Sequence, residues 1–256
     1  MAANHGLMSV TRIKRVIKAL LPPVIVHAIR PREARFSTWG EACAHAGSYD
    51  ADLVNRFRSE RHALNTVDDT ILQTSVLGLV VLALPQAPLT VTDFGGATGD
   101  LGQAFLQAYP SSQYIVVENP TMVELMRGKT PVQYTTLMPE QCDVFFTSST
   151  LQYLDDPMKI LKEGLCSAKQ AAVLTRNSFS ETETFREQRS HLFDNGMGPV
   201  PPGYHNIQVS VPHRTIREST VLELAHSMGF RCVARLEEAS GSLPGSYGKQ
   251  LVFFRQ

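Results

Sequence analysis

The chain has 256 residues, enough for one α/β domain of roughly 150–170 residues and an N-terminal addition. Hydrophobic residues make up 43% and charged residues 19%, which is typical of a soluble globular protein. The formal net charge is zero, which argues against a nucleic-acid-binding protein. The four cysteines lie far apart and the eight histidines show no metal-ligand spacing, so we expect reduced thiols, a cytoplasmic protein and no metal site.

The first 36 residues form a basic arm, with seven lysines and arginines against one acid, Glu33. Val10–Leu21 places apolar side chains on one helical face and basic ones on the other, and Pro22-Pro23 ends this helix. Such a segment is too short to span a bilayer. Two interpretations stay open: residues 10–35 lie on an anionic membrane, at the inner face of the cytoplasmic membrane, or the helix packs on its own domain.

Residues 37–85 are predicted to form a helical cap or lid. Phe36–Asn55 sets the only tryptophan, Trp39, among polar turn residues, which favours a cap over a core strand, although Trp39 could equally attach the arm to the domain. Thr70–Leu84 predicts one buried helix, and Pro85 and Pro88 end it.

From residue 86 to 256, predicted strands and helices alternate. This rhythm indicates a Rossmann-like α/β fold, a parallel sheet with helices on both faces, closed by an antiparallel hairpin of two terminal strands. The seven predicted strands are 89–92, 114–118, 132–135, 143–147, 171–175, 230–236 and 250–255, and the helices after the first strand begin at 100, 120, 157 and 215.

A glycine-rich turn follows the first of these strands, in Leu89–Gly102. Its spacing Gly96-x-x-Gly99-x-x-Gly102 matches NAD(P)-dependent short-chain reductases. The stretch Asp93–Gly99 instead resembles motif I of class I S-adenosylmethionine-dependent methyltransferases, with Ala97 in place of the middle glycine. A carboxylate at Asp93 repels a pyrophosphate and attracts a cationic sulfonium or amine, and none of the seven tyrosines has the lysine four residues later that the reductases need. We therefore favour the methyltransferase, with S-adenosylmethionine as cofactor.

The cofactor residues follow from that choice. Asp93 is assigned to the methionine end, partly through water, and Glu118, at the end of the second strand, to the ribose hydroxyls. An apolar residue such as Leu137 would stack on the adenine, and Ser148 and Ser149 follow the fourth strand on the cofactor side. The backbone of the turn completes the set, through Gly95, Gly96, Ala97 and Gly99.

The acceptor side is predicted from the next loop and from an insert. Gln152 and Tyr153 face the acceptor, and the insert 176–214 shapes its pocket, with Tyr204 and Arg176 as further contacts. Arg176 would pair with a phosphate or carboxylate of the acceptor, or with Glu181 or Glu183. A histidine that titrates near neutrality suits the general base. In order of preference, the candidates are His205, His213 and His191.

The resemblance extends to a small family of bacterial methyltransferases associated with surface-polysaccharide biosynthesis. It rests on Trp39-Gly-Glu-Ala, Gly47-Ser-Tyr-Asp50, Asp93-Phe-Gly-Gly, Val117-Glu118 and Leu151-Gln-Tyr-Leu-Asp-Asp-Pro157. It implies O-methylation of a sugar hydroxyl on a cell-surface glycan, such as O-antigen or capsule, or on its lipid-linked precursor. Two alternatives remain open: an NAD(P)-dependent short-chain-type reductase or epimerase acting on a nucleotide sugar, and a non-catalytic, membrane-docked binding module.

Overall fold

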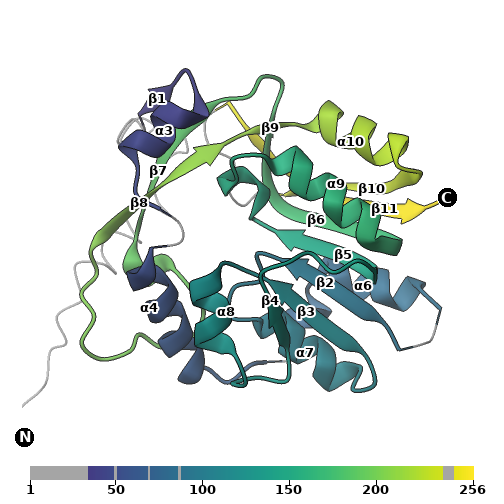
Figure 1. The fold of residues 1–256 in the computed structure, drawn as a ribbon, viewed down its shortest axis with the longest axis horizontal. Coiled ribbons are helices and arrows are strands. Elements are labelled where there is room, and N and C mark those ends of the chain that lie inside the picture. The colour runs from purple at the N-terminus through teal and green to yellow at the C-terminus, as the bar shows by residue number, and fades with distance from the viewer. Residues whose placement is uncertain (1–33, 49–50, 69, 86–87, 239–244) are drawn as a thin grey trace, which may run out of the picture. The chain divides into compact units, whose positions relative to one another are not determined.

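The computed structural model describes residues 34–48, 51–68, 70–85, 88–238 and 245–256. The helices and strands described here all lie in the unit Arg35–Gln256 (Figure 1). The predicted membrane interface over residues 10–35 falls almost wholly outside the described residues. None of the helices in the described part of the chain has the length and apolar character needed to cross a membrane.

A large sheet with the strand order β10-β11-β6-β5-β2-β3-β4 forms the centre of the domain. The strands β2 to β6 are mutually parallel, whereas β11 runs antiparallel to both of its neighbours. A short strand, β9, pairs beside β6. The strands are β2 (Thr90–Phe94), β3 (Gln113–Val117), β4 (Gln133–Thr135), β5 (Cys142–Ser148), β6 (Ala168–Ser180), β9 (Ile216–Arg217), β10 (Phe230–Glu238) and β11 (Tyr247–Arg255). The predicted seven-stranded Rossmann-like sheet with a closing hairpin is confirmed.

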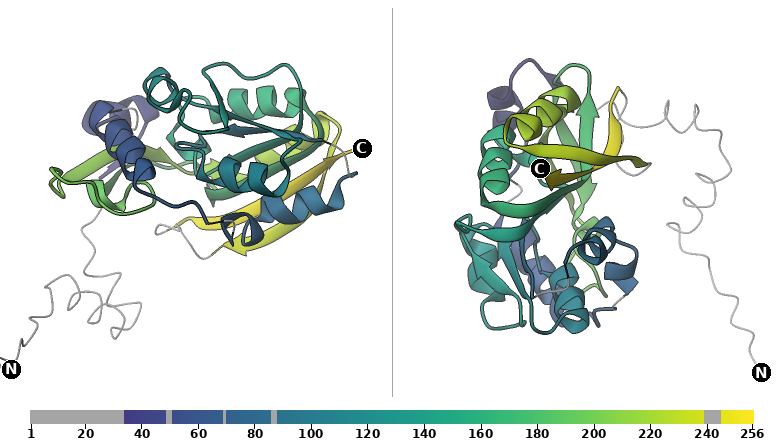
Figure 2. Two further views of the ribbon diagram at one scale, coloured as in Figure 1. Left: turned by 90° about the horizontal axis from the view of Figure 1, so that it is seen from below. Right: turned by 90° about the vertical axis from the view of Figure 1, so that its right-hand side faces the viewer.

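Helices cover both faces of this sheet because successive strand residues point to opposite sides. On one face Val91, Val116 and Val144 pack with α5, α6 and α7, and on the other Phe145 and Leu174 pack with α9 and α10 (Figures 1 and 2). The helices are α5 (Thr70–Gln73), α6 (Val76–Ala83), α7 (Asp100–Ala108), α8 (Pro120–Met126), α9 (Pro157–Ser167) and α10 (Glu218–Ser227). The central parallel strands β2, β5 and β6 are largely buried on both sides, as helices on both faces require.

A second, antiparallel sheet lies beside the carboxyl ends of the parallel strands (Figure 1). It consists of β1 (Arg35–Phe36), β7 (Phe185–His191) and β8 (Gln208–Arg214). Two helices, α3 (Trp39–His45) and α4 (Asp52–Ala63), pack against this sheet and the connection between β7 and β8. Phe57 of α4 packs against Leu192, Phe193 and Tyr204, so that helix and the β7–β8 connection share a small core of their own.

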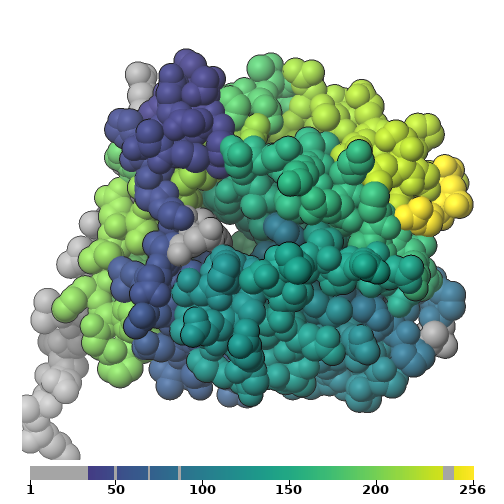
Figure 3. All heavy atoms as spheres, viewed as in Figure 1, coloured from purple at the N-terminus to yellow at the C-terminus, as the bar shows by residue number. Residues whose placement is uncertain are grey.

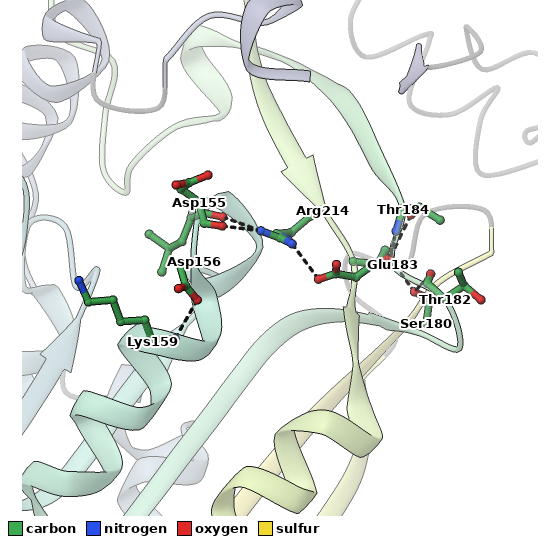
Figure 4. A network of polar contacts seen from close by, with 10 residues as sticks. Asp155, Asp156, Lys159, Ser180, Thr182, Glu183, Thr184 and Arg214 are labelled. Atoms are coloured by element: carbon green, nitrogen blue, oxygen red, sulfur yellow. Dashed lines mark hydrogen bonds and ion pairs between the residues drawn. The ribbon is translucent and has the colours of Figure 1, made fainter. Parts of the chain in front are cut away.

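Arg214 joins the second sheet to the large one (Figure 4). Its guanidinium donates to the carbonyl of Asp155 at 2.7 Å and to the carboxylate of Glu183 at 2.9 Å. It also lies over the rings of Trp39 and Phe185, at 5.3 and 5.1 Å from their centres, and these two rings contact each other edge to face. Trp39 therefore packs α3 against the second sheet.

Three sequence expectations about elements need correction. The single helix over Thr70–Leu84 is two helices, α5 and α6, because Ser75 caps the second one by accepting a hydrogen bond from the backbone of Leu77. The fifth predicted strand extends to thirteen residues as β6. The helix expected from residue 215 starts at Glu218, after β9.

Candidate functional site

A cleft of about 940 Å³ opens between the two sheets, and Figure 3 shows the hollow beside α4. One wall is made by the carboxyl ends of β2, β5 and β6, where α/β proteins bind their ligands. The other wall comes from α4, β7, β8 and the residues between those two strands. The predicted site residues on its lining are Asp93, Gly95, Gly96, Ala97, Ser148, Ser149, Tyr153 and Arg176.

The glycine turn closes tightly over the end of β2. Gly95 has φ +77°, and Gly99, with φ +68°, is the N-cap of α7. A Cβ on Gly96 would collide with the carboxylate of Asp93, and one on Gly95 would collide with the side chain of Thr150. The sequence needs glycine at both positions because of the close approach, and at Gly95 also because of the left-handed backbone.

Asp93 lies beneath this turn, at the floor of the cleft, with 3% of its surface exposed. The Tyr114 hydroxyl donates to its Oδ2 at 2.8 Å, while its Oδ1 is buried and has no hydrogen-bond partner in the described part of the chain. Burial, with a smaller contribution from the nearby Glu118, raises the pKa of Asp93 to about 7, against the hydrogen bond from Tyr114. A buried carboxylate with a free oxygen is a place where a bound cation would be stabilised.

Backbone strain is concentrated at the cleft. Among the described residues, Ala97, Ser149 and Arg176 are the non-glycine residues with positive φ, at 49°, 58° and 56°. All three line the cleft, after β2, after β5 and within β6. Such backbone costs on the order of 1–3 kcal/mol per residue and clusters at functional sites. This strain marks the same cleft independently of the glycine motif.

The loop after β5 brings four predicted residues together. Ser148 and Ser149 line the cleft, and Gln152 lies behind them, buried, where its amide donates to Ser149 Oγ at 3.1 Å. Tyr153 lines the cleft and donates to the side-chain oxygen of Gln188 on β7 at 3.1 Å. Gln152 therefore positions Ser149 rather than facing the acceptor, and Tyr153 links the two walls.

Several predicted residues lie away from the lining. Glu118 follows β3 as expected, but its carboxylate accepts from the backbone of Ala97 at 3.1 Å and of Asn119 at 2.9 Å. Gly99 serves as a helix cap, Leu137 is 74% exposed beyond β4, and Tyr204 packs on Phe57. Tyr204 is therefore a packing residue outside the cleft lining, and the stacking role of Leu137 stays a prediction.

The expectation of a histidine base at the acceptor is not met either, because none of the three candidates lines the cleft. His205 is exposed beyond the lining, and His191 is exposed beside Asp194. His213 is 1% exposed and accepts a hydrogen bond from Arg186, and burial together with that arginine lowers its pKa to about 3. His213 is therefore a neutral packing residue near pH 7.

Sequence reasoning missed the wall opposite the glycine turn. Gln188 and Ser190 share one face of β7 and pair with Val211 and Val209 of β8, and all four line the cleft. The signal that could have found them is the alternation of side chains along a strand, which places residues 188 and 190 on one face of β7. Also missed was Arg58 of α4, which is buried in the lining and donates to Asn195 at 3.2 Å.

A second missed feature holds the glycine turn and α7 against α4. His62 contacts Asp100, the first residue of α7, at 3.0 Å between Nδ1 and Oδ1, and Thr98 donates to the other oxygen at 2.6 Å. Burial opposes ionisation of Asp100, but the bonds from His62 and Thr98 outweigh it and lower its pKa. Helix α4 thus belongs to the wall opposite the glycine turn and also contacts the start of α7, which follows that turn. No cluster of three or more metal-ligating side chains occurs among the described residues.

Comparison with known proteins places the fold. No family model and no curated protein matches the chain. Among solved structures, the chain is similar to CalS10, an amino pentose methyltransferase from Micromonospora echinaspora, in complex with S-adenosylmethionine. The sequence identity is 15% and the TM-score 0.53, over 83% of this chain and 100% of CalS10. It is also similar to Streptomyces venezuelae DesVI, at 14% identity and TM-score 0.53 over 78% and 98% of the two chains. The chain therefore has the fold of class I S-adenosylmethionine-dependent methyltransferases.

A third similar structure is an S-adenosylmethionine-dependent methyltransferase from Clostridium acetobutylicum. Its identity is 10% and its TM-score 0.50, over 76% of this chain and 94% of that chain. At these identities the likeness defines the fold and leaves the substrate to be argued from the site.

Proposed function

We propose that this protein transfers a methyl group from S-adenosylmethionine to a sugar hydroxyl. The observation that carries the proposal is the glycine turn closed over the buried Asp93 at the carboxyl end of β2, on the floor of a cleft. S-adenosylmethionine, when bound, supplies an electrophilic methyl group on a cationic sulfur.

The residues of the turn fit a cationic ligand. Asp93 keeps one oxygen on Tyr114 and leaves the other without a partner in the described chain, so a positive group above the turn would draw it into its ionised form. A dinucleotide pyrophosphate in the same place would face that carboxylate and be repelled. The antiparallel strand β11 between β6 and β10 also favours the methyltransferase over the reductase.

The acceptor wall fits a polyhydroxylated molecule. Uncharged amide and hydroxyl side chains face the cleft from both sides, including Ser148, Ser149, Tyr153, Gln188 and Ser190. Side chains of this kind donate and accept, as sugar hydroxyls do. The name of CalS10, an amino pentose methyltransferase, is compatible with this acceptor class. The family resemblance in the sequence extends the proposal to a surface glycan or its lipid-linked precursor.

The reaction balances without a further reactant. With the cofactor held above the turn by Asp93 and the backbone of Gly95 and Gly96, methyl transfer would exchange the bond between sulfur and carbon for one between carbon and the acceptor oxygen, and the hydroxyl proton would leave to solvent. The chain would contribute by holding the hydroxyl in line with the methyl group, which is how positioning accelerates a displacement.

A labelled methyl transfer assay tests the function. Full-length protein is incubated with methyl-labelled S-adenosylmethionine and glycan extract, with Gly96→Val as the matched control because its side chain would clash with Asp93. We expect label that stays on the glycan after mild alkali, as an ether does. Binding of S-adenosylhomocysteine without any transfer would instead support the non-catalytic binding module.

We also propose that the acceptor is met at the inner face of the cytoplasmic membrane, through the basic residues 10–35. Four basic residues gather on one predicted helical face there, and anionic lipids attract such faces at about 1 kcal/mol for each charge. Flotation with anionic liposomes should fail on deletion of residues 1–30. Equal flotation of both proteins would remove the membrane from the proposal.

A further inference from the structure

A bulge in β6 turns Arg176 toward the cleft. Leu174 and Asn177 of β6 pair with Leu251 and Lys249 of β11, so Thr175 and Arg176 lie opposite the single residue Gln250. Arg176 takes φ +56°, and its backbone N–H donates to the carboxylate of Glu238 on β10 at 2.7 Å. A bulge of this kind re-aims a side chain, and it recurs beside active sites.

The bulge lies where the parallel ladder ends. Ser148 of β5 pairs with Thr175, and the backbone of Ser149 donates to the carbonyl of Thr175 at 2.9 Å. Arg176 is exposed and lines the cleft. The strained residue Arg176 therefore directly follows the residue that bonds Ser149, and it lies two strands away from the glycine turn that follows β2.

The other charged groups on the cleft lining are already engaged. The acids Asp93, Asp100 and Glu238 bond to Tyr114, to His62 with Thr98, and to the backbone of Arg176. Asp194 accepts from the backbone of His191, and Arg58 donates to Asn195.

Neither of the two acids that the sequence offers to Arg176 forms an ion pair with it among the described residues. Glu183 pairs with Arg214 (Figure 4), and the side chain of Arg217 donates to the backbone of Glu181. Within the described ranges the guanidinium of Arg176 makes no ion pair. A guanidinium on the lining of a cleft, without an ion-pair partner of its own, is suited to bidentate binding of an oxyanion.

We propose that Arg176 binds an oxyanion of the methyl acceptor, a phosphate or a carboxylate, so that the acceptor is an acidic sugar. This inference rests on the proposed function, because it takes the end of β6 as the acceptor side of a methyltransferase cleft. The planar fork of arginine discriminates such groups from neutral hydroxyls.

Calorimetry with three sugar probes tests the proposal. Glucose 1-phosphate, glucuronate and methyl glucoside are each titrated into the full-length protein, with and without saturating S-adenosylhomocysteine. Two variants remove the guanidinium: Arg176→Gln, and Arg176→Gly, which also relieves the positive φ and so guards against misfolding. The control is Arg189→Gln, because the side chain of Arg189 bonds Glu187 and is not part of the cleft lining.

We expect the wild type to bind at least one anionic probe more tightly than methyl glucoside. Both Arg176 variants should bind that probe about tenfold or more weakly, as loss of a charged hydrogen-bond partner implies, and Arg189→Gln should bind it like the wild type. The affinity of both Arg176 variants for S-adenosylhomocysteine should equal that of the wild type. The preferred probe then tells whether the oxyanion is a phosphate or a carboxylate.

Three results would overturn the proposal: no anionic preference in the wild type, an anionic affinity that survives both Arg176 variants, or a loss confined to S-adenosylhomocysteine, which would assign Arg176 to the carboxylate of the cofactor. Arg176-dependent binding of an anionic probe by a protein that does not bind S-adenosylhomocysteine would keep the oxyanion site and refute the methyltransferase.

Discussion

Replacing Asp93 by asparagine should change how stability depends on pH. The carboxylate is buried under the glycine turn and its pKa is raised from 3.8 to about 7, whereas in the unfolded chain it returns to its ordinary value. A raised folded-state pKa contributes stability that is complete below about pH 4 and is lost as the pH rises through about 7. Asparagine does not ionise and can still accept the hydrogen bond of Tyr114.

The magnitude follows from the size of the shift. About three pKa units correspond to ~4 kcal/mol at roughly 1.4 kcal/mol per unit, an upper value for a group this deeply buried. The free energy of unfolding of the wild type, relative to Asp93→Asn, should fall by up to that amount between pH 4 and pH 8. His213, whose pKa is lowered to about 3, gives a slope of opposite sign in both proteins, so it cancels in the difference.

Urea unfolding at intervals of half a pH unit measures this difference, with the slope in denaturant checked for constancy. Glu124→Gln, an exposed carboxyl on α8, is the control and should run parallel to the wild type. A difference between wild type and Asp93→Asn that stays flat from pH 4 to pH 8 would refute the reasoning about the buried carboxylate.

The remaining predictions concern the turn and its supports. Gly96→Ala should weaken S-adenosylhomocysteine binding at least about tenfold in calorimetry, because its methyl group meets the carboxylate under the turn; unchanged affinity would mean that the turn is not the cofactor site. Arg214→Met should cost about 2 kcal/mol in urea unfolding through the lost charged bonds, whereas Arg189→Met, at an exposed position, should cost little. His62→Ala should cost about 1 kcal/mol near pH 7, and less as acid protonates its partner Asp100; a pH-independent cost would contradict this pairing.

The part of the fold that the sequence predicts is the part with strong local patterns. Runs of Val, Ile and Phe indicate the buried strands, and prolines at 120 and 157 mark the starts of two helices. The acid and the glycines of residues 93–99 indicate the turn after the first strand. The order of these elements along the chain implies the parallel sheet. The closing hairpin follows from two apolar strands flanking a polar loop. These features needed no contact between distant parts of the chain.

The second sheet could not be predicted in the same way. The strands β7 and β8 carry arginine, histidine and glutamine with few apolar residues, and they pair across a long connection. Their register decides that Gln188 faces the cleft and that His213 lies against Arg186. The histidines were chosen by their ordinary pKa, which is a property of the free side chain, whereas burial sets the pKa of His213.

Arg58 and Arg176 illustrate the same limit. Arg58 reaches the cleft because α4 packs its Phe57 against the second sheet, and Arg176 does so because of a bulge opposite Gln250. Neither a packing direction nor a bulge has a signature in the local sequence. The residue types at the site could be suggested, but their roles depend on these tertiary contacts.

Isothermal titration of the full-length protein with S-adenosylhomocysteine and with NADP, at pH 8 where Asp93 is ionised, is the most direct test of the central claim. We expect one saturable site for S-adenosylhomocysteine, weakened by Gly96→Ala, and no binding of NADP. Binding of NADP with no binding of S-adenosylhomocysteine would contradict it.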